Sequence, residues 1–163
     1  MATVQLHTTM GDIVIELFEA KAPKTVANFL AYLNAGHYQG TIFHRVIGTF
    51  MIQAGGFDTN MRQKPAPNTV ENEARNGLKN VKYSVAMART SDPHSAGAQF
   101  FINVTDNAFL NFPGQDGWGY AVFGQVLKGF EVVDKIAQVP TGAQDVPREQ
   151  IVIESAELVP ESA

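Results

Sequence analysis

The sequence predicts a mainly β fold, either a closed antiparallel barrel or a sandwich, with two helices. Short apolar, β-branched segments separated by turn residues recur along the 163 residues, a pattern typical of both architectures. Only two segments have helical periodicity, and two helices cannot cover both faces of a parallel sheet. Apolar residues make up 45% of the chain and charged residues 17%, which indicates a packed core rather than disorder. We therefore expect one domain spanning residues 1–163.

The chain opens with a predicted β-hairpin. Residues 3–7 alternate between polar and apolar, residues 10–12 form a turn, and the β-branched residues 13–18 supply the second strand. A helix follows, because apolar side chains recur at the spacing of one buried face. This apolar stripe consists of Val26, Phe29, Leu30 and Leu33. We expect Pro23 in the first turn of the helix and Gly36 at its end.

Six further strands and one shorter helix complete the predicted fold. The strands are expected at residues 41–46, 51–54, 84–88, 100–104, 120–126 and 151–159. The helix is expected after Gly129, and Pro140 prevents its continuation. Its buried face is predicted to consist of Phe130, Val133, Ile136 and Ala137. With the hairpin, the count is eight strands and two helices. Residues 55–82 show neither period and predict a long loop, of a kind that is usually functional or mobile.

Composition excludes several classes of function. The chain has no cysteine, so it has no disulfide scaffold, thiolate zinc site or cysteine nucleophile. Its net charge of −4 argues against binding to nucleic acid. The N-terminus lacks a signal-peptide pattern, and no apolar run approaches the roughly 20 residues that span a membrane. We therefore expect a cytoplasmic protein without membrane contact. The four histidines are scattered, which predicts no metal site.

Two stretches combine apolar and polar side chains in a manner that favours a ligand site. They are residues 43–56 (FHRVIGTFMIQAGG) and 98–103 (AQFFIN). Strand alternation predicts that Phe43 and Arg45 share one side and that a return of the chain brings Gln53 near Arg45. Gln99 and Phe101 also share a side. Apolar pockets with a few polar groups are common ligand sites, but an edge strand with one snorkelling arginine gives the same pattern. Spacing alone leaves both interpretations open.

At these motifs the sequence resembles the cyclophilins, which are peptidyl-prolyl cis-trans isomerases. The matching segments cover essentially the whole chain in the same order, at residues 9–13, 22–29, 43–56, 95–102 and 120–124. The chain is most similar to the small cytoplasmic bacterial members, which share the Gly-Trp-Gly-Tyr sequence of residues 117–120. The resemblance implies a closed eight-stranded antiparallel β-barrel capped by two helices. Its interior is expected to be filled, with the active groove on the outer face.

The resemblance implies an enzyme that rotates Xaa–Pro bonds in unfolded or folded proteins and assists their folding. It implies a monomer that needs no cofactor and whose partners are proline-containing peptides and proteins. The residues implied to act in catalysis are Arg45, Gln53, Phe50 and Gln99. Those implied to bind substrate are Met51, Ala88, Arg89, Phe101, Phe109, Leu110 and Tyr120. Among these, Ala88 and Arg89 are expected to pair through their main chain with the peptide.

Three positions depart from the commonest eukaryotic pattern of the family. Phe109 stands where tryptophan is usual, Tyr120 where histidine is usual, and Arg89 where asparagine is usual. Phenylalanine lacks the N–H donor of tryptophan, so we expect cyclosporin to bind weakly.

Two other classes of function compete with the enzyme. A binding module of the same fold could hold proline-containing segments without turnover, although it would not require Arg45. A barrel that binds a small ligand inside would need a less filled interior than the many Phe, Ile and Val residues predict. Packing roles are expected for Phe18, Phe29, Phe43, Phe100, Phe123 and Phe130. We expect His44 to be a hydrogen-bonded structural residue rather than a proton shuttle.

Overall fold

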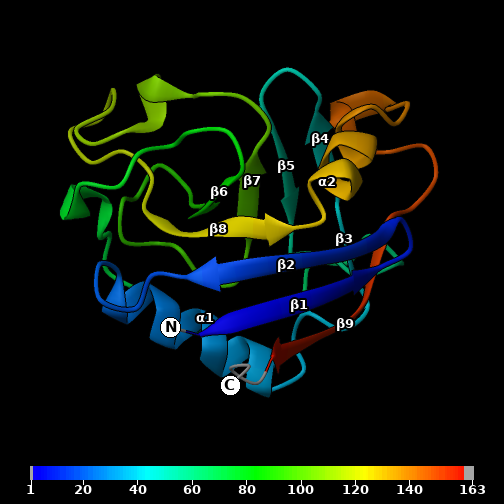
Figure 1. The fold of residues 1–163 in the computed structure, drawn as a ribbon, viewed down its shortest axis with the longest axis horizontal. Coiled ribbons are helices and arrows are strands. Elements are labelled where there is room, and N and C mark those ends of the chain that lie inside the picture. Colours follow the sequence, from blue (N-terminus) through cyan, green and yellow to red (C-terminus); the bar gives the residue numbers. More distant parts are fainter. Residues whose placement is uncertain (1, 160–163) are drawn as a thin grey trace.

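The computed structural model describes residues 2–159, which form one nine-stranded antiparallel sheet and two α-helices (Figure 1). The strands are β1 (Thr3–Thr8), β2 (Gly11–Leu17), β3 (Thr41–Ile42), β4 (Arg45–Ile47), β5 (Met51–Ala54), β6 (Ser84–Met87), β7 (Phe100–Asn103), β8 (Val122–Lys128) and β9 (Val152–Val159). The helices are α1 (Pro23–Asn34) and α2 (Phe130–Ala137), with short 3₁₀ helices η1 (Ala74–Asn76), η2 (Ala108–Leu110) and η3 (Ala143–Asp145). Within this part of the chain, no helix is long and apolar enough to cross a membrane.

The sheet runs in the order β3-β9-β1-β2-β8-β6-β7-β5-β4. The predicted opening hairpin is confirmed, since β1 and β2 pair from Thr3 opposite Glu16 to Thr8 opposite Gly11. The sheet curls so that its two ends approach each other, and α1 and α2 lie on opposite sides of the β1–β2 hairpin (Figure 1). Helix α2 packs against β2, β4 and β5, while α1 packs against β9.

The predicted strand at residues 41–46 is divided in two, and this corrects both the strand count and the predicted closed barrel. β3 pairs with β9, whereas β4 pairs with β5. The two strands are therefore the opposite edges of the described sheet, joined only by Phe43 and His44. The prediction that Phe43 and Arg45 share a side is also wrong. Phe43 is 1% exposed in the core, while Arg45 lies on the outer surface, because the interruption breaks the alternation.

An aromatic cluster forms the centre of the core. Phe29 of α1 lies against three rings, with centroid distances of 4.9 Å to Tyr38, 5.7 Å to Phe100 and 5.2 Å to Phe123. All four side chains are completely buried. The predicted apolar stripe of α1 thus explains how this helix closes the interior of the sheet, and a filled interior is confirmed.

Phe18 and Phe130 are the exceptions among the phenylalanines that were expected to pack in the core, since Phe18 is only half-buried and joins neither buried cluster. Phe130 departs further. It is 39% exposed and meets the edge of the Tyr83 ring, at a centroid distance of 4.8 Å. Helix α2 instead buries Val132, Val133 and Ile136. The helix thus turns a slightly different face to the sheet than its periodicity predicts.

His44 lies in the linker between β3 and β4, against the ring of Phe57 at a centroid distance of 4.5 Å. Its Nδ1 atom is buried without a hydrogen-bond partner among the described residues, so the prediction of a hydrogen-bonded histidine is wrong for this atom. Burial, and secondarily the positive charge of Arg45, lower the pKa of His44 to about 4.

This lowered pKa makes stability depend on pH. Between the ordinary value of 6.5 and about 4, the unfolded chain binds a proton at His44 that the folded protein does not. We therefore expect the free energy of unfolding to decrease as pH falls through this window. Below about pH 4, His44 should cause no further decrease. Urea unfolding at several pH values, compared with a His44→Phe variant, measures this contribution. The slope of the unfolding free energy against pH should differ between the two proteins by an amount that corresponds to at most one bound proton. Identical slopes would contradict the lowered pKa of His44.

Candidate active site

A row of cross-strand partners crosses the outer face of the sheet from its β4 edge. Arg45 of β4 is opposite Gln53 of β5, which is opposite Phe101 of β7, which in turn is opposite Ala86 of β6. Residues directly opposite each other in antiparallel strands share a face. The predicted proximity of Arg45 and Gln53 is thus confirmed, and it follows from the tight return between β4 and β5.

A pocket of about 400 Å³ opens on this face. Its lining residues are Arg45, Phe50, Met51, Gln53, Ala88, Arg89, Phe101, Phe109, Leu110, Gly114, Gln115, Asp116, Gly119 and Tyr120. Ten of the eleven residues proposed from the sequence are in this lining. The eleventh, Gln99, lines an adjoining pocket of about 360 Å³ together with Gln53. The structure thus brings all eleven residues to two adjoining pockets, which share Gln53, Ala88 and Arg89.

The floor of the pocket is apolar and shielded from water, while its rim is exposed. Met51, Phe101 and Leu110 are only 2–7% exposed and pack together in a cluster separate from the main core. Phe109 is 55% exposed and its ring stacks on Phe50 at a centroid distance of 5.6 Å. Such a pocket can hold a small apolar ring against its floor while leaving the attached chain in solvent.

Polar groups lie along one side of this apolar floor. Gln53 Nε2 donates a hydrogen bond of 2.8 Å to Gln99 Oε1, and Ala88 N donates one of 3.0 Å to Gln99 O. Arg45 is exposed, and no hydrogen bond or ion pair within residues 2–159 engages its guanidinium. The group therefore presents its N–H donors to a ligand in the pocket.

Gly56 determines where the Gln99 side chain lies. Its backbone conformation is one that any residue adopts, but a Cβ atom there would overlap the side-chain amide of Gln99. We expect Gly56→Ala to push Gln99 away from Gln53 and to lower by about tenfold the kcat/KM on the proline peptides that the family resemblance implies as substrates, because a misplaced group near a reacting centre is costly. The control is Gly142→Ala, at a glycine with open space around it. Equal activities of the two variants would show that the Gln99 position does not matter.

A set of amide side chains behind the pocket was missed by the sequence reasoning. Asn107 Nδ2 donates to the carbonyl oxygen of Phe50 at 2.9 Å and to Asn103 Oδ1 at 2.7 Å. Asn103 Nδ2 donates to Asn80 Oδ1 at 3.0 Å. These buried amides fix the backbone that carries Phe50. Their nearness in space arises from strand pairing, so no local motif indicates them.

The wall formed by residues 114–119 was also missed. The backbone φ angles of Gly114, Gly117 and Gly119 are +59°, +86° and +74°, in the left-handed region that favours glycine. The recurrence of glycine before Tyr120 is the signal that could have indicated a tight loop here.

Arg89 lines the pocket, but its side chain is only 3% exposed and bonds to Asp116 and Gly119. No hydrogen bond among the described residues uses its main-chain N–H or carbonyl. Its main chain is therefore free to pair with a peptide, whereas its side chain is already engaged.

Known proteins resemble this chain in both sequence and structure. A family model described as cyclophilin type peptidyl-prolyl cis-trans isomerase matches residues 3–158. The peptidyl-prolyl cis-trans isomerase cyp18 of Streptomyces antibioticus is 61% identical, over 98% of this chain and 99% of its own length. Peptidyl-prolyl cis-trans isomerase B of Escherichia coli K12 is 58% identical, over 93% and 96% of the two chains.

Solved structures agree with these sequence matches. A cyclophilin-type peptidyl-prolyl cis-trans isomerase of Cryptosporidium parvum has a TM-score of 0.83 at 29% identity, over 99% of both chains. A second structure of that protein, determined in the presence of the dipeptide Ala-Pro, has a TM-score of 0.79 at 30% identity, over 94% and 96% of the two chains. Together with the match over residues 3–158, this similarity establishes that the chain belongs to the cyclophilin-type peptidyl-prolyl cis-trans isomerases.

Proposed function

We propose that this enzyme isomerises Xaa–Pro bonds by holding the proline ring on the apolar floor while Arg45 stabilises the twisted amide. The observation that carries this mechanism is the guanidinium of Arg45, which no other described residue engages, beside the buried side chains of Met51, Phe101 and Leu110. Gln53 and Gln99 are proposed to orient the substrate backbone or Arg45.

The chemistry of the reaction suits such a site. Rotation about a peptide bond is opposed by a barrier of about 18–20 kcal/mol, because the nitrogen lone pair is delocalised into the carbonyl. In the twisted transition state the nitrogen becomes pyramidal and regains its lone pair, which can then accept a hydrogen bond. A donor aimed at that nitrogen stabilises the transition state more than either planar state, and only such differential interactions raise kcat. No bond to carbon is broken, so the step needs no nucleophile.

Arg45 alone cannot supply the whole acceleration. Reducing the exchange time from about 100 s to about 1 ms is a factor of roughly 10⁵, or about 7 kcal/mol. A hydrogen bond from a charged group contributes about 1.5–3 kcal/mol. The remainder is assigned to the pocket, which fixes the proline ring and excludes water from the Arg45 interaction.

The proposed substrates are proline-containing peptides and unfolded or folded proteins with accessible Xaa–Pro bonds, and the proposed cellular role is assistance to protein folding. The structure of the Cryptosporidium parvum relative determined in the presence of Ala-Pro supports this substrate class. We further propose that the enzyme acts as a monomer in the cytoplasm, a proposal supported by the motifs shared with small cytoplasmic bacterial members of the family.

The direct test is the rate of cis–trans exchange in a short Xaa–Pro peptide, followed by NMR exchange spectroscopy with and without the wild-type protein. We expect exchange to accelerate in proportion to protein concentration. A protein that binds the peptide without accelerating exchange would instead be a binding module.

Cyclosporin affinity tests the effect of having phenylalanine at position 109, where tryptophan is usual in the family. This ring lies at the exposed rim of the pocket and stacks on Phe50, where a tryptophan could donate an additional hydrogen bond through its indole N–H. We expect Phe109→Trp to bind cyclosporin about tenfold more tightly than the wild type, as one further hydrogen bond warrants. Titration calorimetry measures both affinities, and exchange assays check that each protein is active. If both proteins bound cyclosporin equally well, the missing indole N–H at position 109 would not explain weak binding by the wild type.

A further inference from the structure

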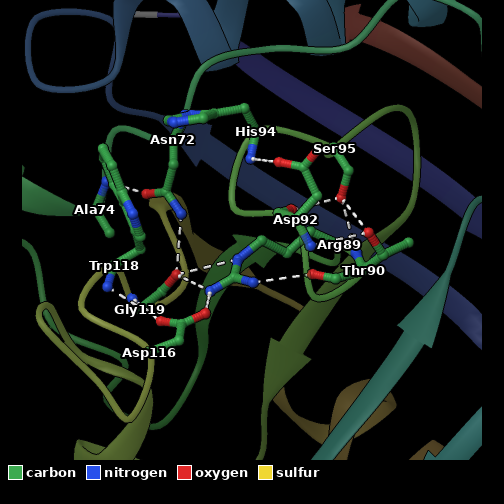
Figure 2. Close-up of polar contacts among 10 residues, drawn as sticks. All are labelled: Asn72, Ala74, Arg89, Thr90, Asp92, His94, Ser95, Asp116, Trp118 and Gly119. Atoms are coloured by element: carbon green, nitrogen blue, oxygen red, sulfur yellow. Dashed lines mark hydrogen bonds and ion pairs between the residues drawn. The ribbon is translucent and has the colours of Figure 1, made fainter.

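Arg89 follows β6 by two residues, and its guanidinium is buried between two loops (Figure 2). Nη2 donates to Asp116 Oδ2 at 2.6 Å and to the Gly119 carbonyl oxygen at 2.8 Å. Nε also donates to the Gly119 oxygen, at 3.2 Å, and Nη1 donates to the Thr90 oxygen at 2.9 Å. Four of the five N–H groups of the guanidinium are thus bonded within the protein. The Arg89 side chain therefore serves the fold of the pocket wall rather than the peptide.

The same guanidinium lies on the face of the Tyr120 ring, with Cζ 4.4 Å from the ring centroid. Tyr120 in turn meets the edge of Phe101 on the pocket floor, at a centroid distance of 5.9 Å. The Tyr120 N–H donates to the Leu110 carbonyl oxygen at 2.9 Å. Cation–π contacts with a buried cation are favourable, so Arg89 helps to fix an aromatic ring that contacts Phe101 on the pocket floor.

The segment at residues 111–119 belongs to no helix or strand, so side-chain hydrogen bonds contribute to its position. The Gly119 oxygen that Arg89 binds also accepts a hydrogen bond of 3.0 Å from Asn72 Nδ2. Asp116 Oδ1 accepts the N–H groups of Trp118 and Gly119 at 3.0 and 3.2 Å. The hydrogen bond from Arg89, and then those two, lower the pKa of Asp116 to about 2. The carboxylate therefore stays charged at neutral pH, and Arg89 bonds both ends of the 116–119 turn.

We propose that Arg89 is a positioning residue for the isomerase reaction, which holds the Tyr120 ring and the 116–119 turn as a preformed wall of the proline pocket. This inference rests on the proposed function. It adds that the buried guanidinium of Arg89 orders the wall and does not itself bind the substrate. The wall should contact the planar and twisted forms of the substrate alike, whereas Arg45 is proposed to stabilise the twisted form. Loss of the wall should therefore raise KM and leave kcat nearly unchanged.

The test compares Arg89→Met, which keeps an unbranched stem of similar length, with Arg75→Met, at an exposed arginine outside the pocket lining. We expect Arg89→Met to raise KM for an Xaa–Pro peptide about tenfold with kcat within about twofold, and Arg75→Met to change neither. Arg89→Lys should behave as Arg89→Met does, because an ammonium lacks the planar fork that binds Asp116 and Gly119 together.

Trp118 supplies a readout that is independent of catalysis. It is the single tryptophan of the chain, and its main-chain N–H donates to Asp116 Oδ1. If Arg89 orders this turn, acrylamide should quench the fluorescence of Trp118 more strongly in Arg89→Met than in the wild type, while cooperative urea unfolding of both Arg89→Met and Arg75→Met shows that the global fold is retained. The affinity for the dipeptide Ala-Pro should fall in parallel.

A double-mutant cycle with Tyr120→Leu tests the route of the effect. Because Arg89 acts through the Tyr120 ring and the turn before it, we expect Arg89→Met to raise KM much less in the Tyr120→Leu background than in the wild type. Additive effects, an unchanged KM, or a fall in kcat equal to that in kcat/KM would each overturn the proposal. If the wild type proved inactive, the proposed function would fail, and Trp118 quenching with Ala-Pro affinity would still decide whether Arg89 orders the wall.

Discussion

Replacing Arg45 by alanine is expected to lower kcat/KM for an Xaa–Pro peptide by about 100-fold, the effect of losing one hydrogen bond from a charged group at the reacting nitrogen. Arg45 is exposed and engages no other group among the described residues, so its truncation removes nothing on which the fold depends. We therefore expect the urea midpoint of unfolding to stay unchanged. Exchange spectroscopy on the peptide gives the rate, and circular dichroism gives the midpoint.

Arg45→Lys is the informative control for this experiment. It keeps the positive charge but not the planar arrangement of donors, so we expect an activity between those of the wild type and Arg45→Ala. If Arg45→Ala were as fast as the wild type, the arginine mechanism would be wrong, although the pocket could still bind proline. A kcat effect at Arg45 combined with a KM effect at Arg89 would separate the two arginines that line the pocket.

Replacing Phe29 by alanine is expected to cost about 3–5 kcal/mol of the free energy of unfolding, the range for removing a large buried aromatic side chain. Phe29 is completely buried and touches the rings of Tyr38, Phe100 and Phe123. Its truncation would leave a cavity where α1 meets the interior of the sheet. Urea unfolding at neutral pH measures the loss.

The matched control is Phe130→Ala, because Phe130 is 39% exposed on α2. Surface substitutions rarely cost much, and we expect a loss of about 1 kcal/mol or less. Equal losses at the two positions would contradict the distinction between the buried cluster and the exposed ring, and with it the placement of α1 over the core.

Sequence reasoning succeeded where a local period decides the structure. The bounds of β5 were predicted without error because Gly48 and the Gly55–Gly56 pair bracket a short apolar run. The division between β3 and β4 could not be predicted, because residues 41–47 (TIFHRVI) contain no glycine or proline to mark a break. That division depends on β9, which pairs with β3 from a distant part of the chain, whereas β4 pairs with the neighbouring β5.

The candidate site shows the same limit. The step from Arg45 to Gln53 follows from the short return between β4 and β5, and Phe101 follows from the family pattern, so these residues could be named in advance. The buried position of the Arg89 side chain depends on Asp116 and Gly119, about 30 residues further along. A single sequence cannot distinguish such an arginine from a solvated one, and the same holds for the amides of Asn80, Asn103 and Asn107.

The split between β3 and β4 has a consequence for a protein whose proposed substrates include unfolded chains. An open sheet normally offers a long unpaired strand edge, on which another extended chain can add and begin to aggregate. Here the two edge strands contain only two and three residues, and the linker at Phe43 and His44 joins them directly. The sheet thus presents almost no unpaired strand edge for such pairing. A bound peptide can occupy the pocket without adding to the edge of the sheet.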